Sequence, residues 1–188
     1  MHSETDAVPT QTLYALVIYL PSPLGPFLDE LRLKLVPGCN PHAHVSVLPP
    51  RTLPGAPEAA IAESREILSG FAPFEIRLGE IEKFERTDVV YIALESGEEQ
   101  LREMHRRLNA GILAFDEPFV YHPHVTLAQE IPPERVAEVH EKALQMWRGF
   151  SGSRTFLAEA AVFVRNTKRN FWIDIASEPL LAAAPAES

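Results

Sequence analysis

The chain has 188 residues, of which 46% are hydrophobic and 23% charged, a balance typical of one folded globular domain and not of a disordered chain. Its longest apolar run, residues 13–20, is too short for a membrane-spanning helix, and the N-terminus carries no signal-peptide pattern. The single cysteine, Cys39, excludes an internal disulfide. We therefore expect a cytoplasmic protein with no membrane partner. The net charge of −9, with basic residues clustered only in pairs, favours a small substrate or a short strand end over a long nucleic-acid groove.

The first half of the chain predicts the order strand, helix, strand, helix, strand. The first strand is β-branched, aromatic and apolar on both alternating faces, which is typical of a strand buried on both sides. The first helix should end at Pro37 and Gly38, and the strand in "PHAHVSVLPP" should end at its two final prolines. The first strand covers residues 12–20 and the first helix residues 23–35. After the histidine strand, the sequence predicts a helix over 57–71 and a half-buried strand over 74–84.

The second half repeats this order and adds one strand. Its predicted elements are strands over 89–95, 155–165 and 171–176, helices over 98–113 and 132–147, and a strand in "YHPHVTLAQE". Tyr14 and Tyr91 fall at matching places 77 residues apart, and the histidines of the two quoted phrases lie 80 apart. Internal duplication explains the repeat and predicts two similar lobes related by a pseudo-two-fold axis.

No Gly/Ser linker separates the two halves. We therefore expect one integrated domain over residues 12–176, flanked by a flexible N-terminus over 1–11 and a flexible tail over 177–188, in a monomeric protein.

The two quoted phrases share the pattern H-x-H-V-[ST]. Because residues two apart on a strand point to the same face, His44 should project beside Ser46, and His124 beside Thr126. If the lobes face each other, one histidine can take a proton while the other gives one, and the hydroxyls can donate to an oxyanion. Hydrolysis of a cyclic phosphodiester needs those groups, with no metal and no cofactor.

At these residues the sequence resembles the two-histidine (2H) phosphoesterase superfamily, which includes RNA 2′-5′ ligases and cyclic phosphodiesterases. "HVSV" and "HVTL" look like its paired H-x-[ST]-x signatures, with Ser46 where threonine is common. The resemblance covers residues 13–175 and is strongest to small bacterial phosphoesterases. It implies an α+β, bilobal fold in which two antiparallel sheets line a central cleft with helices outside. It also implies catalytic histidines at His44 and His124 and phosphate-binding hydroxyls at Ser46 and Thr126.

The expected activity is metal-independent hydrolysis of a cyclic phosphodiester. The expected partner is a small nucleotide or a short RNA end carrying a 2′,3′-cyclic phosphate, or a related cyclic nucleotide. Three alternatives stay open: RNA 2′-5′ ligation, in which a ribose hydroxyl replaces water; binding of a phosphorylated ligand without catalysis; and a zinc-dependent hydrolase, because His42/His44 and His122/His124 also form two H-x-H pairs.

Several further residues are candidates with weaker signals. His42 and His122 could orient the catalytic rings or lie exposed in loops. Tyr121 could stack on a base or pack in the protein, and Arg51 could contact phosphate or lie in solvent, as could Lys168 and Arg169 in the last turn. His105 and His140 lie on the apolar stripes of their helices, which favours core or boundary positions.

Overall fold

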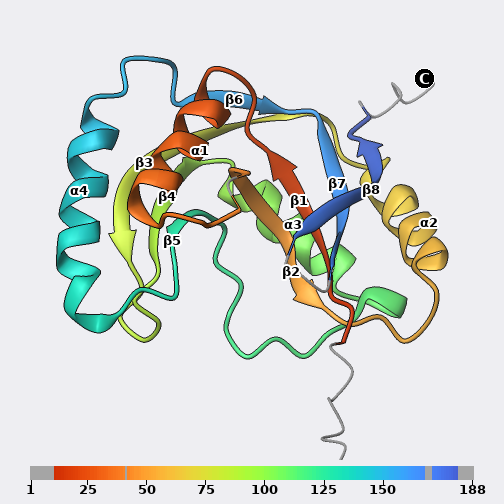
Figure 1. Cartoon of the computed structure of the whole chain (residues 1–188). Helices are drawn as coiled ribbons and strands as arrows, with labels where there is room; N and C mark the ends of the chain where they lie inside the picture. The colour runs from red at the N-terminus through yellow and green to blue at the C-terminus, as the bar shows by residue number, and fades with distance from the viewer. Residues whose placement is uncertain (1–10, 41, 168–170, 182–188) are drawn as a thin grey trace, which may run out of the picture.

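A computed structural model describes residues 11–40, 42–167 and 171–181 (Figure 1). Four α-helices and eight strands follow one another in the order that the sequence predicts, up to the last strands. The strands are β1 (Tyr14–Tyr19), β2 (His44–Arg51), β3 (Phe74–Lys83), β4 (Val90–Ser96), β5 (His124–Ala128), β6 (Thr155–Ala158), β7 (Ala160–Asn166) and β8 (Trp172–Pro179). The helices are α1 (Leu24–Leu35), α2 (Pro57–Leu68), α3 (Glu98–Leu108) and α4 (Val136–Arg148), with single 3₁₀ turns at Gly111–Leu113 and Pro133–Arg135.

The eight strands form one antiparallel sheet in the order β6-β3-β4-β5-β2-β1-β7-β8. The expectation of two sheets therefore needs a correction, because the two halves of the sheet meet through one residue pair, Val45 of β2 opposite Val125 of β5. We call β2-β1-β7-β8 the first lobe and β5-β4-β3-β6 the second lobe. The bilobal α+β architecture is confirmed, and the lobes are halves of a continuous sheet.

The two lobes exchange elements. β3 follows the first histidine strand along the chain but pairs with β4 in the second lobe, and β7 returns to pair with β1 in the first. The helices cross in the same way, since α1 contacts β5 and α3 contacts β2. Figure 1 shows α4 beside β3 on one side of the molecule and α2 near β8 on the other. Neither half of the sequence therefore forms a lobe alone.

One hydrophobic core lies between the sheet and the helices. Val45, Val47, Val125 and Leu127 are fully buried in it, together with apolar residues from all four helices. The intervening residues of β2 and β5 are only half-buried and point to the opposite face, which we call the site face. This alternation is the two-residue period of a strand, and it confirms that each histidine shares a face with its hydroxyl partner.

Three predicted elements differ from the structure. β2 does not end at Pro49 and Pro50 but continues to Arg51, because these prolines fall where the register with β1 is irregular and no regular ladder bond is needed. The predicted strand over 155–165 is divided at Glu159, so that β6 pairs with β3 and β7 pairs with β1. The third helix ends at Leu108, five residues before its predicted end.

The duplication is confirmed in outline but not at its tyrosines. Strand register places Val17 opposite Ser46 and Tyr91 opposite Thr126, so Val17 and not Tyr14 occupies the place that corresponds to Tyr91. The predicted C-terminal boundary is also too early, because β8 continues past Ala176 to Pro179 and Leu180 is buried. Residues 1–10 and 182–188, most of the two predicted flexible ends, lie outside the described residues.

Among the residues that the structure describes, no helix combines the length and the apolar character needed to cross a membrane.

Candidate active site

Four side chains of the two repeated phrases meet at the centre of the sheet. Because Val45 lies opposite Val125 in an antiparallel pair, His44 lies across from Thr126 and Ser46 across from His124. The histidines thus occupy two opposite corners of a square and the hydroxyls the other two. In a regular antiparallel pair such diagonal neighbours are about 7–8 Å apart, a gap that a phosphoryl group can fill.

Both histidine rings are held in the same way. Nδ1 of His44 donates to the main-chain carbonyl of His42 at 2.7 Å, and Nδ1 of His124 donates to that of His122 at 2.6 Å. A carbonyl oxygen only accepts, so the proton of each neutral ring is on Nδ1 and the lone pair on Nε2 is left for chemistry. The lone pair of His124 accepts from the Thr126 hydroxyl at 3.1 Å.

His42 and His122 therefore orient the rings of His44 and His124, as one of the two interpretations predicts, but they do so through their main-chain carbonyls. Their own rings differ. The exposed ring of His42 stacks on Tyr19 at 3.6 Å, whereas the Nε2 atom of His122 is buried without a hydrogen-bond partner in the structure. The described residues include no group of three or more His, Cys, Asp or Glu side chains placed to hold a metal ion.

Burial favours the neutral form of both the His44 and the His124 ring. Desolvation is the main reason that the pKa of His44 falls from 6.5 to about 4. The hydrogen bond to the His42 carbonyl opposes this fall, and the nearby guanidinium of Arg32 adds to it. Desolvation also lowers the pKa of His124, against the opposing effect of the hydrogen bond from its ring to the His122 carbonyl. A bound phosphate would oppose both effects, because its negative charge favours protonated imidazole.

Aromatic side chains surround the second histidine. Phe84 and Tyr91 stack on each other at 4.1 Å and present their rings to His124 at centroid distances of 5.1 and 5.2 Å. Beside the first histidine, the ring of Tyr19 lies edge-on to His44 at 6.4 Å and its hydroxyl donates to Asp174 at 2.6 Å. Sequence reasoning missed these residues. The signal available for Tyr91 was its place on the strand beside the second histidine phrase.

Arg51 is not a substrate contact. Its side chain is 1% exposed, and its guanidinium donates to the main-chain carbonyls of Pro49 and Leu113, to Asn109 and to Glu117. With its donors directed at protein acceptors and no surface facing solvent, it holds the segment after α3 against the first histidine strand. Lys168 and Arg169 lie outside the described residues.

Tyr121 packs inside the protein, so it is not placed to stack on a base. Its ring lies parallel to that of His105 at 4.0 Å, and its hydroxyl donates to the main-chain carbonyl of Ser46 at 2.8 Å. His105 itself is half-buried, as its helical stripe predicts, and its Nε2 atom pairs with Glu117 at 2.9 Å.

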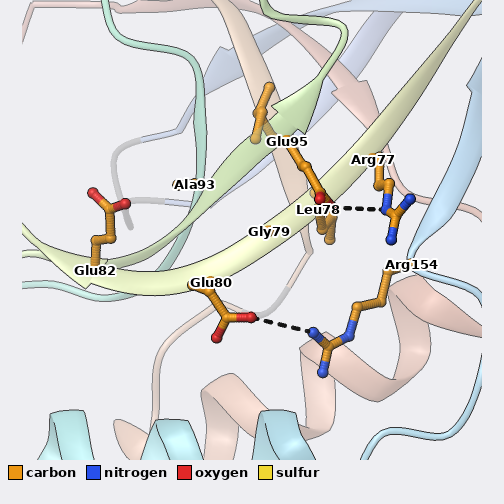
Figure 2. A pocket seen from close by; sticks show the side chains of 9 residues that line it. Arg77, Leu78, Gly79, Glu80, Glu82, Ala93, Glu95 and Arg154 are labelled. Carbon is orange, nitrogen blue, oxygen red and sulfur yellow. Dashed lines mark ion pairs between the residues drawn. The ribbon is translucent and has the colours of Figure 1, made fainter.

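The two lobes present different surfaces on the site face. In the first lobe an apolar cluster of Ala15, Val17 and Val164 packs with Tyr19, Val162 and Trp172. In the second lobe a cavity of about 380 Å³ lies along β3 and β4 and includes Ala93, the residue opposite His124. Figure 2 shows the charged side chains of this cavity, where Arg77 pairs with Glu95 and Arg154 with Glu80.

Comparison with known proteins identifies the family of this chain. The model of the 2′-5′ RNA ligase superfamily matches residues 20–170. "Putative phosphoesterase GK0864" of Geobacillus kaustophilus is 24% identical over 138 residues, which cover 69% of this chain and 76% of that protein.

Solved structures share the fold. The crystal structure of Escherichia coli LigT with phosphate superposes with a TM-score of 0.65 at 15% identity, covering 92% of this chain and all of that one. TT0787 of Thermus thermophilus gives 0.62 at 20% identity with the same coverage. The resemblance seen in the two histidine phrases is thus confirmed, and the chain belongs to the 2′-5′ RNA ligase superfamily of two-histidine phosphoesterases.

Proposed function

We propose that this protein is a metal-independent phosphoesterase that hydrolyses a cyclic phosphodiester, such as the 2′,3′-cyclic phosphate of a nucleotide or of a short RNA end. The observation that carries the proposal is the square of two imidazoles and two hydroxyls around Val45 and Val125. Both imidazoles have Nδ1 engaged by a carbonyl, so in each ring Nε2 is the nitrogen left to accept or donate a proton.

In the proposed reaction, Nε2 of one histidine removes a proton from water as the water oxygen attacks phosphorus. The bond from phosphorus to one ribose oxygen breaks, and the other histidine, protonated at Nε2, gives its proton to that oxygen. The hydroxyls of Ser46 and Thr126 donate to the non-bridging oxygens, where negative charge increases in the transition state. The product is a phosphomonoester with a free neighbouring hydroxyl.

Two observations, one on another protein and one on this chain, support a nucleotide substrate. Escherichia coli LigT, which shares the fold, has been crystallised with phosphate and with 3′-AMP. In this chain the apolar and aromatic cluster of the first lobe, which includes Val17 opposite Ser46 and Tyr19 opposite His44, offers a surface against which a base can pack. We propose that the phosphate lies among the four central residues and the base against this cluster.

The test is turnover of a panel of 2′,3′-cyclic nucleotides and short RNAs ending in a cyclic phosphate, with and without excess EDTA. We expect cleavage that survives EDTA and is lost by a factor of about 10²–10⁴ in each of His44→Ala and His124→Ala. His140→Ala, on the outer helix α4, is the matched control and should keep its activity. The pH–rate profile should be bell-shaped, because one histidine must be neutral and the other charged.

Other outcomes would select the alternatives. Activity that EDTA abolishes and zinc restores would assign the H-x-H pairs to a metal. Joining of two RNA ends in place of hydrolysis would indicate the ligase reaction, and saturable phosphate binding without turnover would indicate a binding protein. Near-full activity in either single histidine variant would contradict the paired acid–base scheme.

A further inference from the structure

The two histidine strands are joined weakly at the position of the site. Only the pair Val45–Val125 connects β2 to β5 among the described residues. Towards the start of β5 the ladder cannot continue in the usual way, because Pro123 has no N–H to donate. A second connection is therefore needed if the Ser46 hydroxyl and the His124 imidazole, which lie on opposite strands, are to keep a fixed separation.

The hydroxyl of Tyr121 supplies this connection. It donates at 2.8 Å to the main-chain carbonyl of Ser46, a residue 75 positions earlier in the chain. Tyr121 itself stands three residues before His124. The bond thus ties the segment that leads into the second histidine strand to the residue that carries the first phosphate-binding hydroxyl.

The tyrosine is fixed on its other sides. Its ring stacks on His105 with an interplanar angle of 4°, and Nη1 of Arg102 donates to its main-chain carbonyl at 2.6 Å. His105 in turn contacts Glu117, which is paired with the buried Arg51. Burial raises the pKa of the Tyr121 phenol above its usual range, so the hydroxyl remains protonated and able to donate.

The duplicated sequence has no second copy of this bond. The position that corresponds to Tyr121 in the first phrase, 80 residues earlier, is a proline, which has no hydroxyl. The hydroxyl that corresponds to Ser46 in the second phrase belongs to Thr126, and it contacts His124 on its own strand. The connection therefore acts on Ser46 alone.

We propose that Tyr121 is a positioning residue that holds Ser46 at its working distance from His124. This role rests on the proposed function. It predicts that Tyr121→Phe, which keeps the stacked ring and removes the donor, lowers kcat by roughly 10–100-fold while KM stays within about twofold. The reason is that the hydrogen bond from the Ser46 hydroxyl to the phosphoryl oxygens is strongest in the transition state, where these oxygens gain negative charge. A misplaced hydroxyl therefore weakens transition-state binding more than substrate binding.

A double-mutant cycle tests whether the effect passes through Ser46. In a Ser46→Ala background, Tyr121→Phe should cost less than about twofold further in kcat, because the hydroxyl that it positions is gone. In a Thr126→Ala background it should keep its full effect. Tyr14→Phe, a tyrosine of β1 that packs on Phe163, is the matched control for the substitution and should not change kcat.

The outcomes separate this inference from the proposed function. Equal losses in the Ser46→Ala and Thr126→Ala backgrounds would show a general structural effect and overturn the positioning role. If the wild-type protein cleaves no member of the panel, the same cycle is measured on the dissociation constant of inorganic phosphate by NMR titration. A wild-type protein that neither cleaves the panel nor binds phosphate refutes the proposed function, whereas phosphate binding with additive effects refutes the role of Tyr121 alone.

Discussion

Arg51 provides a quantitative test of what holds the segment after α3 in place. Its guanidinium makes four hydrogen bonds to protein acceptors and is paired with Glu117, whose side chain is 11% exposed. Arg51→Met fills similar space without donors, so the nearly buried Glu117 side chain loses the guanidinium and retains the contact with His105. Removing one partner of a buried ion pair costs about 3–5 kcal/mol, and we expect this loss in the free energy of unfolding.

The assay is urea unfolding followed by circular dichroism, with the slope m unchanged and the midpoint lowered. At about 2–4 °C per kcal/mol for a chain of this size, the thermal midpoint should fall by roughly 6–20 °C. Arg106→Met is the matched control, since Arg106 pairs with Glu103 on the surface of α3 with 70% of its side chain exposed. That variant should leave the urea midpoint essentially unchanged, because exposed ion pairs contribute little to stability.

Adding Glu117→Gln to Arg51→Met should recover part of the lost stability, because no uncompensated charge then remains. A loss below about 1 kcal/mol in Arg51→Met would refute the reasoning, because it would mean that the pair behaves like an exposed one.

Two further predictions concern stability. The pKa of His44 is 6.5 in the unfolded chain and about 4 in the folded chain, so the unfolded state binds a proton more readily. The free energy of unfolding should therefore fall as the pH drops from 6.5 towards 4. At pH 5 the loss from this residue should be at most about 2 kcal/mol. Urea midpoints at pH 7.5 and 5 measure this effect, and a His44→Asn variant with an unchanged pH dependence would contradict it. Leu180→Ala should lower the free energy of unfolding by about 2–5 kcal/mol, because the Leu180 side chain is only 4% exposed. Leu181→Ala is the control and should change the unfolding midpoint little, because Leu181 is 48% exposed. Equal effects of the two substitutions would mean that the chain beyond β8 is not part of the core.

Local sequence patterns could predict most helices and strands and the four central side chains, because a two-residue period assigns His44 and Ser46 to one face without any knowledge of the fold. Pairing between strands could not be predicted in this way. The division at Glu159 arises because β6 and β7 find partners in different lobes, and nothing in residues 155–165 alone marks it.

The surroundings of the site were predictable only in part for the same reason. Arg51 looks like a loop charge beside its proline neighbours, and its burial depends on Glu117, 66 residues later. The role of Tyr121 depends on a bond across 75 residues. The roles of such residues depend on tertiary contacts, which the local sequence does not show. The histidine phrases differ, because each places its imidazole and its hydroxyl two positions apart on one strand.

The exchange of strands between lobes has a consequence for synthesis of the protein. The first lobe begins with β1 and β2 but is completed by β7 and β8, whose residues 160–179 leave the ribosome more than a hundred residues later. Until then one edge of β1 has no partner strand. Domains commonly fold during translation, N-terminal parts first. Of the two site histidines, His44 is translated first, but it belongs to the lobe that is finished last.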